Sequence, residues 1–237
     1  MKVLIIIPVY NEEQNIINTV NSLNNIDIKG IKLDYMVIND GSIDNTKDIL
    51  IENNIKFIDL PCNLGIGGAV QTGYKYALYN NYDVAIQFDG DGQHNSEYIK
   101  DLIKGITDGY DFVLGSRFIG NINTFKSTTA RRIGSGFISS LIKLCTKKTI
   151  TDPTSGFRAC NKEVIKLFAS EYPTDYPEPD TLVVLLKNNY KVLEIPAEMN
   201  KRNNGASSIT FFKSIYYMIK VSLSIIITSI EKRRTKI

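Results

Sequence analysis

Short runs rich in β-branched residues alternate with stretches of helical periodicity over the first half of the chain, and this alternation is the strongest constraint on the fold. The runs predict strands at residues 3–7, 35–38, 55–58, 84–88 and 112–114. The intervening stretches predict helices at 12–23, 46–52, 68–79 and 97–106. Repeated strand–helix units connect through right-handed crossovers and cover a parallel sheet with helices. The sequence therefore predicts an α/β fold with a mostly parallel central sheet.

The pattern weakens beyond residue 120. It predicts a helix at about 131–144, a loop through Arg158, a further helix, a strand at 192–195 and a loop at 200–208. With 237 residues and 43% hydrophobic content, the chain is long enough to bury one substantial core. We predict a single domain over residues 1–208, followed by a C-terminal helix within 209–237.

The cysteines and the N-terminus indicate a cytoplasmic protein. Cys62, Cys145 and Cys160 are an odd number without metal-ligand spacing, which is typical of free thiols in a reducing compartment. The first apolar run is too short for a secretion signal and leads directly into polar residues at 11–13 without a cleavage site. We expect this run to form a buried strand.

The C-terminal segment is basic and amphipathic. Residues 201–237 hold eight Lys or Arg and one acidic residue, whereas the first 200 residues hold 20 basic and 24 acidic residues. At helical spacing, Lys213, Lys220, Ser224 and Glu231 share one face. The other face is apolar and carries Phe212, Ile215, Ile219, Leu223, Ile226 and Ile230. This pattern favours a helix lying on an anionic membrane surface, and a helix packed on the protein's own core is the alternative.

Polar, glycine-rich segments follow all five predicted strands, where ligands of parallel sheets bind. They span residues 8–12, 39–42, 63–67, 89–94 and 115–117. Asp40 is placed to accept hydrogen bonds from a nucleobase or ribose, with an Asx turn or helix cap as the alternative. The glycines at 65, 67 and 68 would let a phosphate or sugar approach the backbone closely.

Asp89 and Asp91 are two carboxylates one residue apart in a turn after an apolar strand. Both can face one hard cation, and Mg²⁺ or Mn²⁺ suits such oxygen ligands. An ordinary Asp-Gly turn is the alternative interpretation. His94, the only histidine, lies three residues further on and has either a role at the metal or a surface hydrogen bond.

These segments, taken in order, closely resemble glycosyltransferase family 2, whose members have the GT-A fold. The matching segments are PVYNE at 8–12, NDGSID at 39–44, NLG at 63–65 and DGDGQH at 89–94. Further segments resemble the dolichol- and polyprenyl-phosphate sugar synthase branch: GSR at 115–117, RRIGS at 131–135 and TDPTSGFR at 151–158. The chain has no Trp, and therefore no Gln-x-x-Arg-Trp element of processive members.

The resemblance implies a role for individual residues. It places the nucleotide-sugar donor on Pro8, Tyr10, Glu12, Asp40, Gly67, Asp89 and Arg202. It places the metal on Asp89, Asp91 and Gln93, and the acceptor phosphate on Arg117, Arg131 and Ser135. The implied catalytic residues are Asp91, Arg117 and Arg131.

The implied activity is inverting, metal-dependent transfer of a hexose or N-acetylhexosamine from a UDP- or GDP-sugar to a polyprenyl phosphate. The protein would be peripheral on the cytoplasmic face of the cell membrane, with a small integral membrane protein as an expected partner and no nucleic acid. Two alternatives stay open: transfer to a sugar hydroxyl in polysaccharide or cell-wall assembly, and nucleotide-sugar binding without turnover. A hydroxyl acceptor needs a general base, and Glu178 or Asp180 is the candidate unless this acidic turn is structural.

Overall fold

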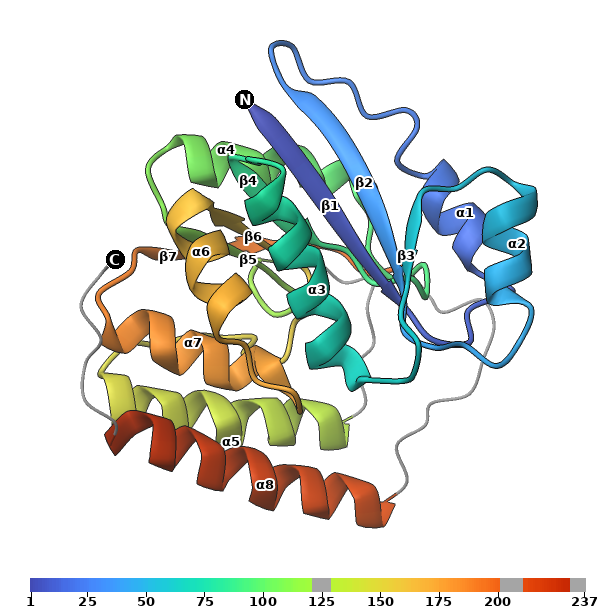
Figure 1. Cartoon of the computed structure of the whole chain (residues 1–237). Helices are drawn as coiled ribbons and strands as arrows, with labels where there is room; N and C mark the ends of the chain where they lie inside the picture. Colours follow the sequence, from blue (N-terminus) through green and yellow to red (C-terminus); the bar gives the residue numbers. More distant parts are fainter. Residues whose placement is uncertain (121–128, 201–210, 231–237) are drawn as a thin grey trace.

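A seven-stranded sheet forms the centre of the protein. The computed structural model describes residues 1–120, 129–200 and 211–230, and the side chains of these residues except 129–131 and 211–215 (Figure 1). The strands are β1 (Lys2–Val9), β2 (Lys32–Asn39), β3 (Phe57–Asp59), β4 (Val84–Gln87), β5 (Phe112–Ser116), β6 (Arg158–Asn161) and β7 (Val192–Pro196). Their order is β3-β2-β1-β4-β6-β5-β7, and every pairing is parallel except those of β6. The predicted α/β fold is confirmed.

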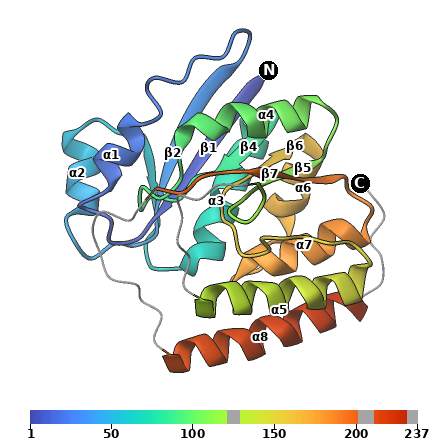
Figure 2. The ribbon, with the colours of Figure 1, turned by 180° about the vertical axis from the view of Figure 1, so that it is seen from behind.

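Helices cover both faces of the sheet (Figures 1 and 2). They are α1 (Ile16–Asn21), α2 (Thr46–Glu52), α3 (Gly65–Tyr79), α4 (Ile99–Thr107), α5 (Thr129–Thr146), α6 (Lys162–Ser170), α7 (Pro177–Lys187) and α8 (Phe211–Ile230), with a short 3₁₀ turn, η1 (Ser96–Tyr98), before α4. Buried side chains of α3, α5, α6, α7 and α8 pack on one face. Those of α1, α2 and α4 pack on the other.

The buried strand β1 explains the two layers. Successive side chains of a strand point to opposite faces of a sheet. Leu4 and Ile6 accordingly belong to the core beneath α3 and α6, whereas Ile5 and Ile7 belong to the core beneath α1 and α4. Because β1 is fully buried, its sequence is continuously apolar rather than alternating, as expected for a central parallel strand.

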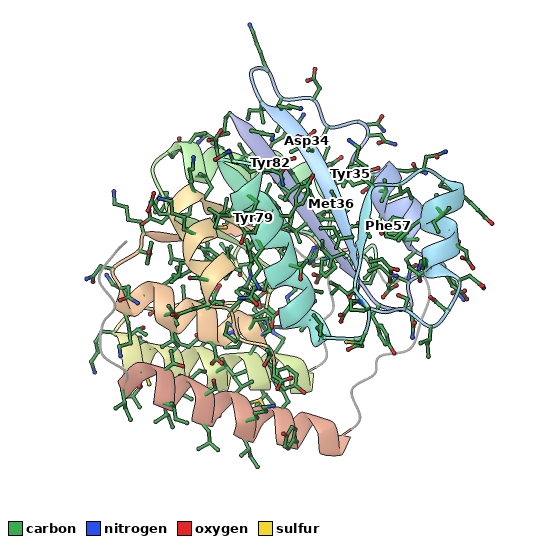
Figure 3. The ribbon with its side chains drawn as sticks, in the orientation of Figure 1. Asp34, Tyr35, Met36, Phe57, Tyr79 and Tyr82 are labelled. Atoms are coloured by element: carbon green, nitrogen blue, oxygen red, sulfur yellow. The ribbon has the colours of Figure 1, made fainter. Side chains whose placement is uncertain are left out.

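Side-chain contacts link the amino ends of β1, β2 and β4. Tyr82, just before β4, reaches across β1 and donates a hydrogen bond to Asp34 of β2, with oxygens 3.0 Å apart (Figure 3). The ammonium of Lys2 lies 4.1 Å from the centre of the Tyr82 ring. The opposite, carboxyl ends of β1 and β2 carry the polar segments.

Strand β6 was not predicted, because the sequence pattern indicated a loop through Arg158 followed directly by a helix. It runs antiparallel between β4 and β5 and begins with Arg158, whose side chain is fully buried. The guanidinium donates to the carbonyl of Ser155 and to the hydroxyl of Thr181 at 3.0 Å. A four-residue strand that opens with an arginine does not match an apolar strand pattern. The burial of this arginine depends on partners distant in sequence, which a local pattern does not reveal.

Helix α8 packs against α5 and α7, with Val221 and Ile225 buried in the same core as α3 and α6. Of the residues predicted for the apolar side, Ile219, Leu223, Ile226 and Ile230 are exposed, whereas Lys220 and Ser224 lie on the side of α8 that contacts the protein. None of the helices in the described ranges is long and apolar enough to cross a membrane. The predicted boundary at residues 208 and 209 lies outside the described residues.

Candidate active site

A cleft of about 450 Å³ opens at the carboxyl ends of β1, β2 and β4. Its lining residues come from these strand ends and from the start of α3: Pro8, Val9, Tyr10, Glu12, Asp40, Asn63, Gly65, Ile66, Ala69, Asp89, Gly90 and Asp91. The set includes most of the residues predicted to hold the donor and its metal. The sheet topology therefore brings together segments that are far apart in sequence, from Pro8 to Asp91.

One end of the cleft is lined by Tyr10 and Asp40. Tyr10 is 44% exposed, and an exposed aromatic ring at a cleft wall can stack on a planar base. Asp40 is 3% exposed, and its Oδ1 accepts the N–H of Leu64 at 2.7 Å. Burial raises the pKa of this carboxyl, although backbone N–H groups of Leu64 and Gly65 oppose the rise. Asp40 thus both lines the cleft and ties the end of β2 to the start of α3.

Asp89 and Asp91 lie in the turn after β4. Gln87 Nε2 donates to Asp89 Oδ1 at 3.1 Å, and the Gln93 N–H donates to Asp91 Oδ1 at 3.0 Å. On the other side of Asp89, Gly156 packs so closely that a Cβ there would lie 2.8 Å from Oδ2. The carboxylates are therefore fixed in position by their neighbours.

The two carboxylates fit a hard divalent cation. The side chain of Asp89 is 35% exposed although Gln87 and His94 beside it are buried, so it faces the cleft. No group of three His, Cys, Asp or Glu side chains in the described ranges could hold a metal on its own. A cation at this site would therefore take its remaining ligands from donor phosphates and water.

His94 supports this turn from behind. It is 5% exposed, and its Nδ1 accepts the backbone N–H of Asp89 at 3.0 Å. Its ring stacks on Phe157 with centres 4.8 Å apart. Burial lowers the pKa of His94, against the raising effect of Asp89 and Asp91, which favours the neutral ring. The alternative of a surface hydrogen bond is wrong, because the core around Phe157 encloses the ring.

Gln93 does not line the cleft. Its backbone N–H bonds to Asp91, and its carbonyl accepts the N–H of Asn200 at 2.7 Å. Arg202 lies outside the described residues. The metal role of Gln93 and the donor role of Arg202 stay predictions.

Gly67 is buried beneath the chain at residues 173–174 rather than lining the cleft. Its N–H donates to the Thr174 carbonyl at 3.2 Å. A Cβ at this position would overlap the carbonyl oxygens of Pro173 and Thr174 and lie 2.6 Å from the Thr174 carbonyl carbon. The backbone at residues 173–174 thus makes the close approach to Gly67 that was expected of a phosphate. Of the glycines at 65, 67 and 68, Gly65 is the one that lines the cleft.

We expect Gly67→Ala to lower the free energy of unfolding by about 1–3 kcal/mol, because rigid backbone must move to admit the methyl group. Gly136→Ala is the matched control: it also lies in a helix, but a Cβ there meets nothing within 4 Å. That substitution should stabilise the protein by about 0.5–1 kcal/mol through helix propensity. Urea unfolding measures both. Equal midpoints for Gly67→Ala and the wild type would contradict the close packing at residues 173–174.

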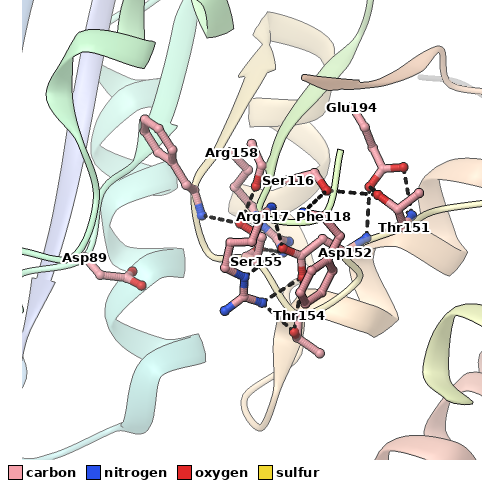
Figure 4. A network of polar contacts seen from close by, with 12 residues as sticks. Asp89, Ser116, Arg117, Phe118, Thr151, Asp152, Thr154, Ser155, Arg158 and Glu194 are labelled. Carbon is pink, nitrogen blue, oxygen red and sulfur yellow. Dashed lines mark hydrogen bonds and ion pairs between the residues drawn. The ribbon is translucent and has the colours of Figure 1, made fainter. Parts of the chain in front are cut away.

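Arg117 is held at the end of β5 by a buried carboxylate (Figure 4). Its Nε and Nη2 each donate to Asp152 at 2.7 Å, and Nη2 also donates to Thr154 at 2.8 Å. The Asp152 side chain is 0% exposed and that of Arg117 12%. Burial by itself lowers the pKa of Arg117. Asp152, with a smaller contribution from Asp89, raises this pKa by more, so the net effect is a rise. The guanidinium is therefore fixed, charged and within electrostatic reach of Asp89.

A second hollow of about 200 Å³ lies beside this pair. It is lined by Phe118, Arg132, Ser135, Gly136 and Thr151. The Ser135 hydroxyl is buried and has no hydrogen-bond partner among the described residues. A buried hydroxyl without a partner is costly, so a ligand that bonds to it would be favoured. Ser135 is therefore a candidate for contact with a ligand in this hollow.

The arginine that lines this hollow is Arg132. Arg131, the predicted acceptor residue, lies in α5, but its side chain is outside the described ones. Adjacent residues of a helix point about 100° apart, so the sequence alone did not decide which of the pair faces the hollow. The role of Arg131 stays a prediction, and Arg132 is a further candidate.

Glu178 and Asp180 lie in the first turn of α7 and face different neighbours. Asp180 accepts a hydrogen bond from Ser224 of α8, and burial raises its pKa to about 6. Burial also raises the pKa of Glu178, opposed by Arg158 and assisted by Asp89. Glu178 is not among the residues that line the cleft, and Asp180 is bonded to α8.

Comparison with known proteins identifies the family. The family model for glycosyl transferase family 2 matches residues 4–168. The chain belongs to glycosyltransferase family 2. It is accordingly an enzyme that transfers sugars, and the resemblance drawn from the strand-end segments is confirmed.

The relatives of this glycosyltransferase include enzymes named for lipid-phosphate acceptors. UDP-N-acetylglucosamine–dolichyl-phosphate N-acetylglucosaminyltransferase of Methanococcus voltae is 30% identical, over 93% of this chain and 96% of the relative. Polyprenol monophosphomannose synthase of Mycolicibacterium smegmatis is 25% identical, over 93% of this chain and 86% of the relative. An uncharacterized protein of Methanocaldococcus jannaschii is 29% identical over 92% and 91% of the two chains.

Solved structures share the fold. Glucosyl-3-phosphoglycerate synthase from Mycobacterium tuberculosis, in complex with Mn²⁺, UDP-glucose and phosphoglyceric acid, superimposes with a TM-score of 0.70 at 14% identity, over 96% of this chain and 79% of that one. TarS of S. aureus gives a TM-score of 0.57 at 18% identity, over 98% and 67%. These neighbours confirm the GT-A-like α/β fold of this family 2 glycosyltransferase.

Proposed function

We propose that this glycosyltransferase moves a sugar from a UDP- or GDP-sugar to a polyprenyl phosphate with inversion. The observation that carries the proposal is the second hollow, which is lined by Arg132 and by Ser135, whose hydroxyl has no partner among the described residues, and which lies beside the Arg117–Asp152 ion pair. Arginine and hydroxyl donors are suited to phosphate oxygens. The relatives named for dolichyl- and polyprenyl-phosphate transfer support the same acceptor.

The donor would occupy the cleft, with its nucleoside against Tyr10 and Asp40. Asp89 and Asp91 would hold Mg²⁺ or Mn²⁺, with Gln93 as a further predicted ligand. When bound, such a cation offsets the negative charge that develops on the leaving nucleoside diphosphate. The Mn²⁺ complexes of structural neighbours support a divalent cation.

A phosphate acceptor changes what the protein must supply. Its oxygen is already anionic, so transfer needs positioning and charge compensation rather than removal of a proton. Arg117 suits this task because Asp152 holds one edge of its guanidinium in place through Nε and Nη2. Within the described residues, Nη1 of Arg117 makes no hydrogen bond, which leaves a donor for the acceptor phosphate.

A sugar hydroxyl is the second candidate acceptor, and Glu178 is the observation that favours it. Burial raises the pKa of this carboxyl, which makes it a stronger base, and Asp89 lies within its electrostatic reach. A general base at this position would accept the proton of an attacking hydroxyl.

Glu178→Gln distinguishes the two acceptors. For a lipid phosphate, we expect transfer to stay within about tenfold of the wild type, because no base is required. A loss on the order of 10²–10⁴-fold at an unchanged melting temperature would instead favour a hydroxyl acceptor. Glu163→Gln, an exposed residue of α6, is the control for the substitution itself.

We further propose that the protein is peripheral on the cytoplasmic face of the membrane, where a small integral membrane partner would complete the assembly. The support is an α5–α8 apolar face, which consists of exposed residues on two neighbouring helices. From α5 these are Ile133, Phe137 and Leu144, and from α8 they are Tyr216, Ile219, Leu223, Ile226, Ile227 and Ile230. Four cations follow α8 in sequence, at residues 232, 233, 234 and 236. An apolar face flanked by cations matches an anionic lipid surface.

A further inference from the structure

Helix α8 is the outermost helix of its layer, and it has two unlike sides (Figures 1 and 2). The outer side contributes to the α5–α8 apolar face. The inner side makes polar and aromatic contacts: Lys220 Nζ lies 2.6 Å from Asp175 Oδ2, and the Ser224 hydroxyl donates to Asp180. A helix that served only to fill the core would bury its apolar side. Here Val221 and Ile225 are buried in the core, but five other apolar residues of α8 stay exposed, and Lys220 and Ser224 add polar contacts to the protein.

The inner contacts converge on the start of α7. Besides Asp175 and Asp180, they include Tyr176, whose ring packs edge to face against Tyr217 of α8 with centres 4.6 Å apart. Tyr176 has a left-handed backbone, with φ 49° and ψ 55°. A non-glycine residue in this region costs on the order of 1–3 kcal/mol and persists only when its surroundings impose it. Contacts with α8 are among those that impose it.

The same turn carries Glu178, in the first turn of α7. The Thr181 hydroxyl donates to the carbonyl of Glu178 at 3.0 Å and accepts from the buried Arg158 at 3.0 Å. The pKa of Tyr217 is raised by burial and by Glu178, and lowered by Arg117, so this α8 side chain lies within electrostatic reach of both. Helix α8 therefore adjoins the site as well as the exterior.

We propose that α8 couples contact with an anionic lipid surface to the start of α7, with Ser224 and Lys220 as positioning residues for the turn that carries Glu178. This coupling rests on the proposed transfer to a membrane lipid. Lipid contact on the outer side of α8 restricts its motion, and the contacts to Asp175 and Asp180 transmit this restriction to the left-handed residue and the turn after it. The free protein and the lipid-bound protein then differ in the order of this turn.

Hydrogen exchange of the full chain tests the coupling without any substrate. The probes are vesicles of equal parts phosphatidylcholine and phosphatidylglycerol, with pure phosphatidylcholine vesicles as the neutral comparison. For the wild type, we expect amide exchange at the start of α7 to slow on the order of tenfold when anionic vesicles are added. Ser224→Ala should bind the vesicles equally well and lose this slowing. Asp180→Asn, whose amide oxygen still accepts from Ser224, should retain it.

Variants of the outer side complete the test. Leu223→Gln combined with Ile227→Gln should lose both vesicle binding and slowing, whereas Ile51→Gln, an exposed residue of α2, should keep both. Lys220→Met breaks the contact with Asp175 and is a second inner-side variant, with the same expectation as Ser224→Ala.

Three results would overturn the coupling. The first is that amide exchange in both inner-side variants slows as much as in the wild type, and the second is that the wild type binds vesicles without any slowing of exchange. The third is that the protein forms a dimer through α8 and does not bind vesicles. Because the readout needs neither donor nor acceptor, a failure of the transfer reaction is distinguishable from a failure of the coupling.

Discussion

Asp91→Asn is expected to reduce sugar transfer by on the order of 10²–10³-fold, the loss typical of removing one group that stabilises charge in the transition state. The amide can still accept the Gln93 N–H, so the turn after β4 should keep its shape. What the variant loses is the negative charge that faces the cleft beside Asp89. We therefore expect an unchanged melting temperature and a weaker dependence on Mg²⁺ or Mn²⁺.

The measurement is initial transfer rate against metal concentration, with Asp101→Asn as the matched control. Asp101 is an exposed carboxylate in the first turn of α4, outside the residues that line the cleft. Asp101→Asn should transfer at the wild-type rate. A normal rate and normal metal dependence in Asp91→Asn would show that the paired carboxylates form only a turn.

Arg117→Ala is expected to lower the free energy of unfolding by about 3–5 kcal/mol, because it leaves the fully buried Asp152 carboxylate without its cation. The family resemblance assigned Arg117 to the acceptor phosphate and to catalysis. The structure adds a stabilising role, since three of its hydrogen bonds hold the segment at residues 152–154 against β5. Thermal and urea unfolding measure the loss directly.

Arg132→Ala is the comparison that separates stability from acceptor binding. Arg132 is exposed and lines the hollow around Ser135, so its removal should change stability by no more than about 0.5 kcal/mol. We expect it to raise the KM for a polyprenyl phosphate without changing the KM for the nucleotide sugar. A stable Arg117→Ala protein would refute the buried ion pair, and an Arg132→Ala protein with unaltered acceptor KM would exclude this hollow as the acceptor site.

Sequence patterns predicted the sheet and the donor side of the site because both depend on local signals. Continuous apolar runs mark buried parallel strands, and the residues after such strands must meet at one edge. Hence Tyr10, Asp40, Asp89 and Asp91 were predicted to form one cleft, and they do.

The acceptor side of the site and the orientation of α8 were not predicted, because both depend on contacts between residues that are distant in sequence. Strand β6 escaped prediction because the buried Arg158 has partners distant in sequence, among them Thr181 of α7 and Phe112 of β5. Periodicity divided α8 into a polar and an apolar side, yet it carries no information on which side meets the protein. That orientation follows from the burial of Val221 and Ile225 and from contacts with Asp175 and Asp180, more than 40 residues away in sequence.

The central claim is that a lipid phosphate accepts the sugar, and the most direct test is to identify the product of the purified chain by mass spectrometry. The reaction would contain Mg²⁺ or Mn²⁺, a panel of UDP- and GDP-sugars, and polyprenyl phosphate together with free sugar acceptors. The account predicts a polyprenyl-phosphate sugar from one donor, absent with Asp91→Asn. Transfer to a sugar hydroxyl while the polyprenyl phosphate stays unmodified would contradict it.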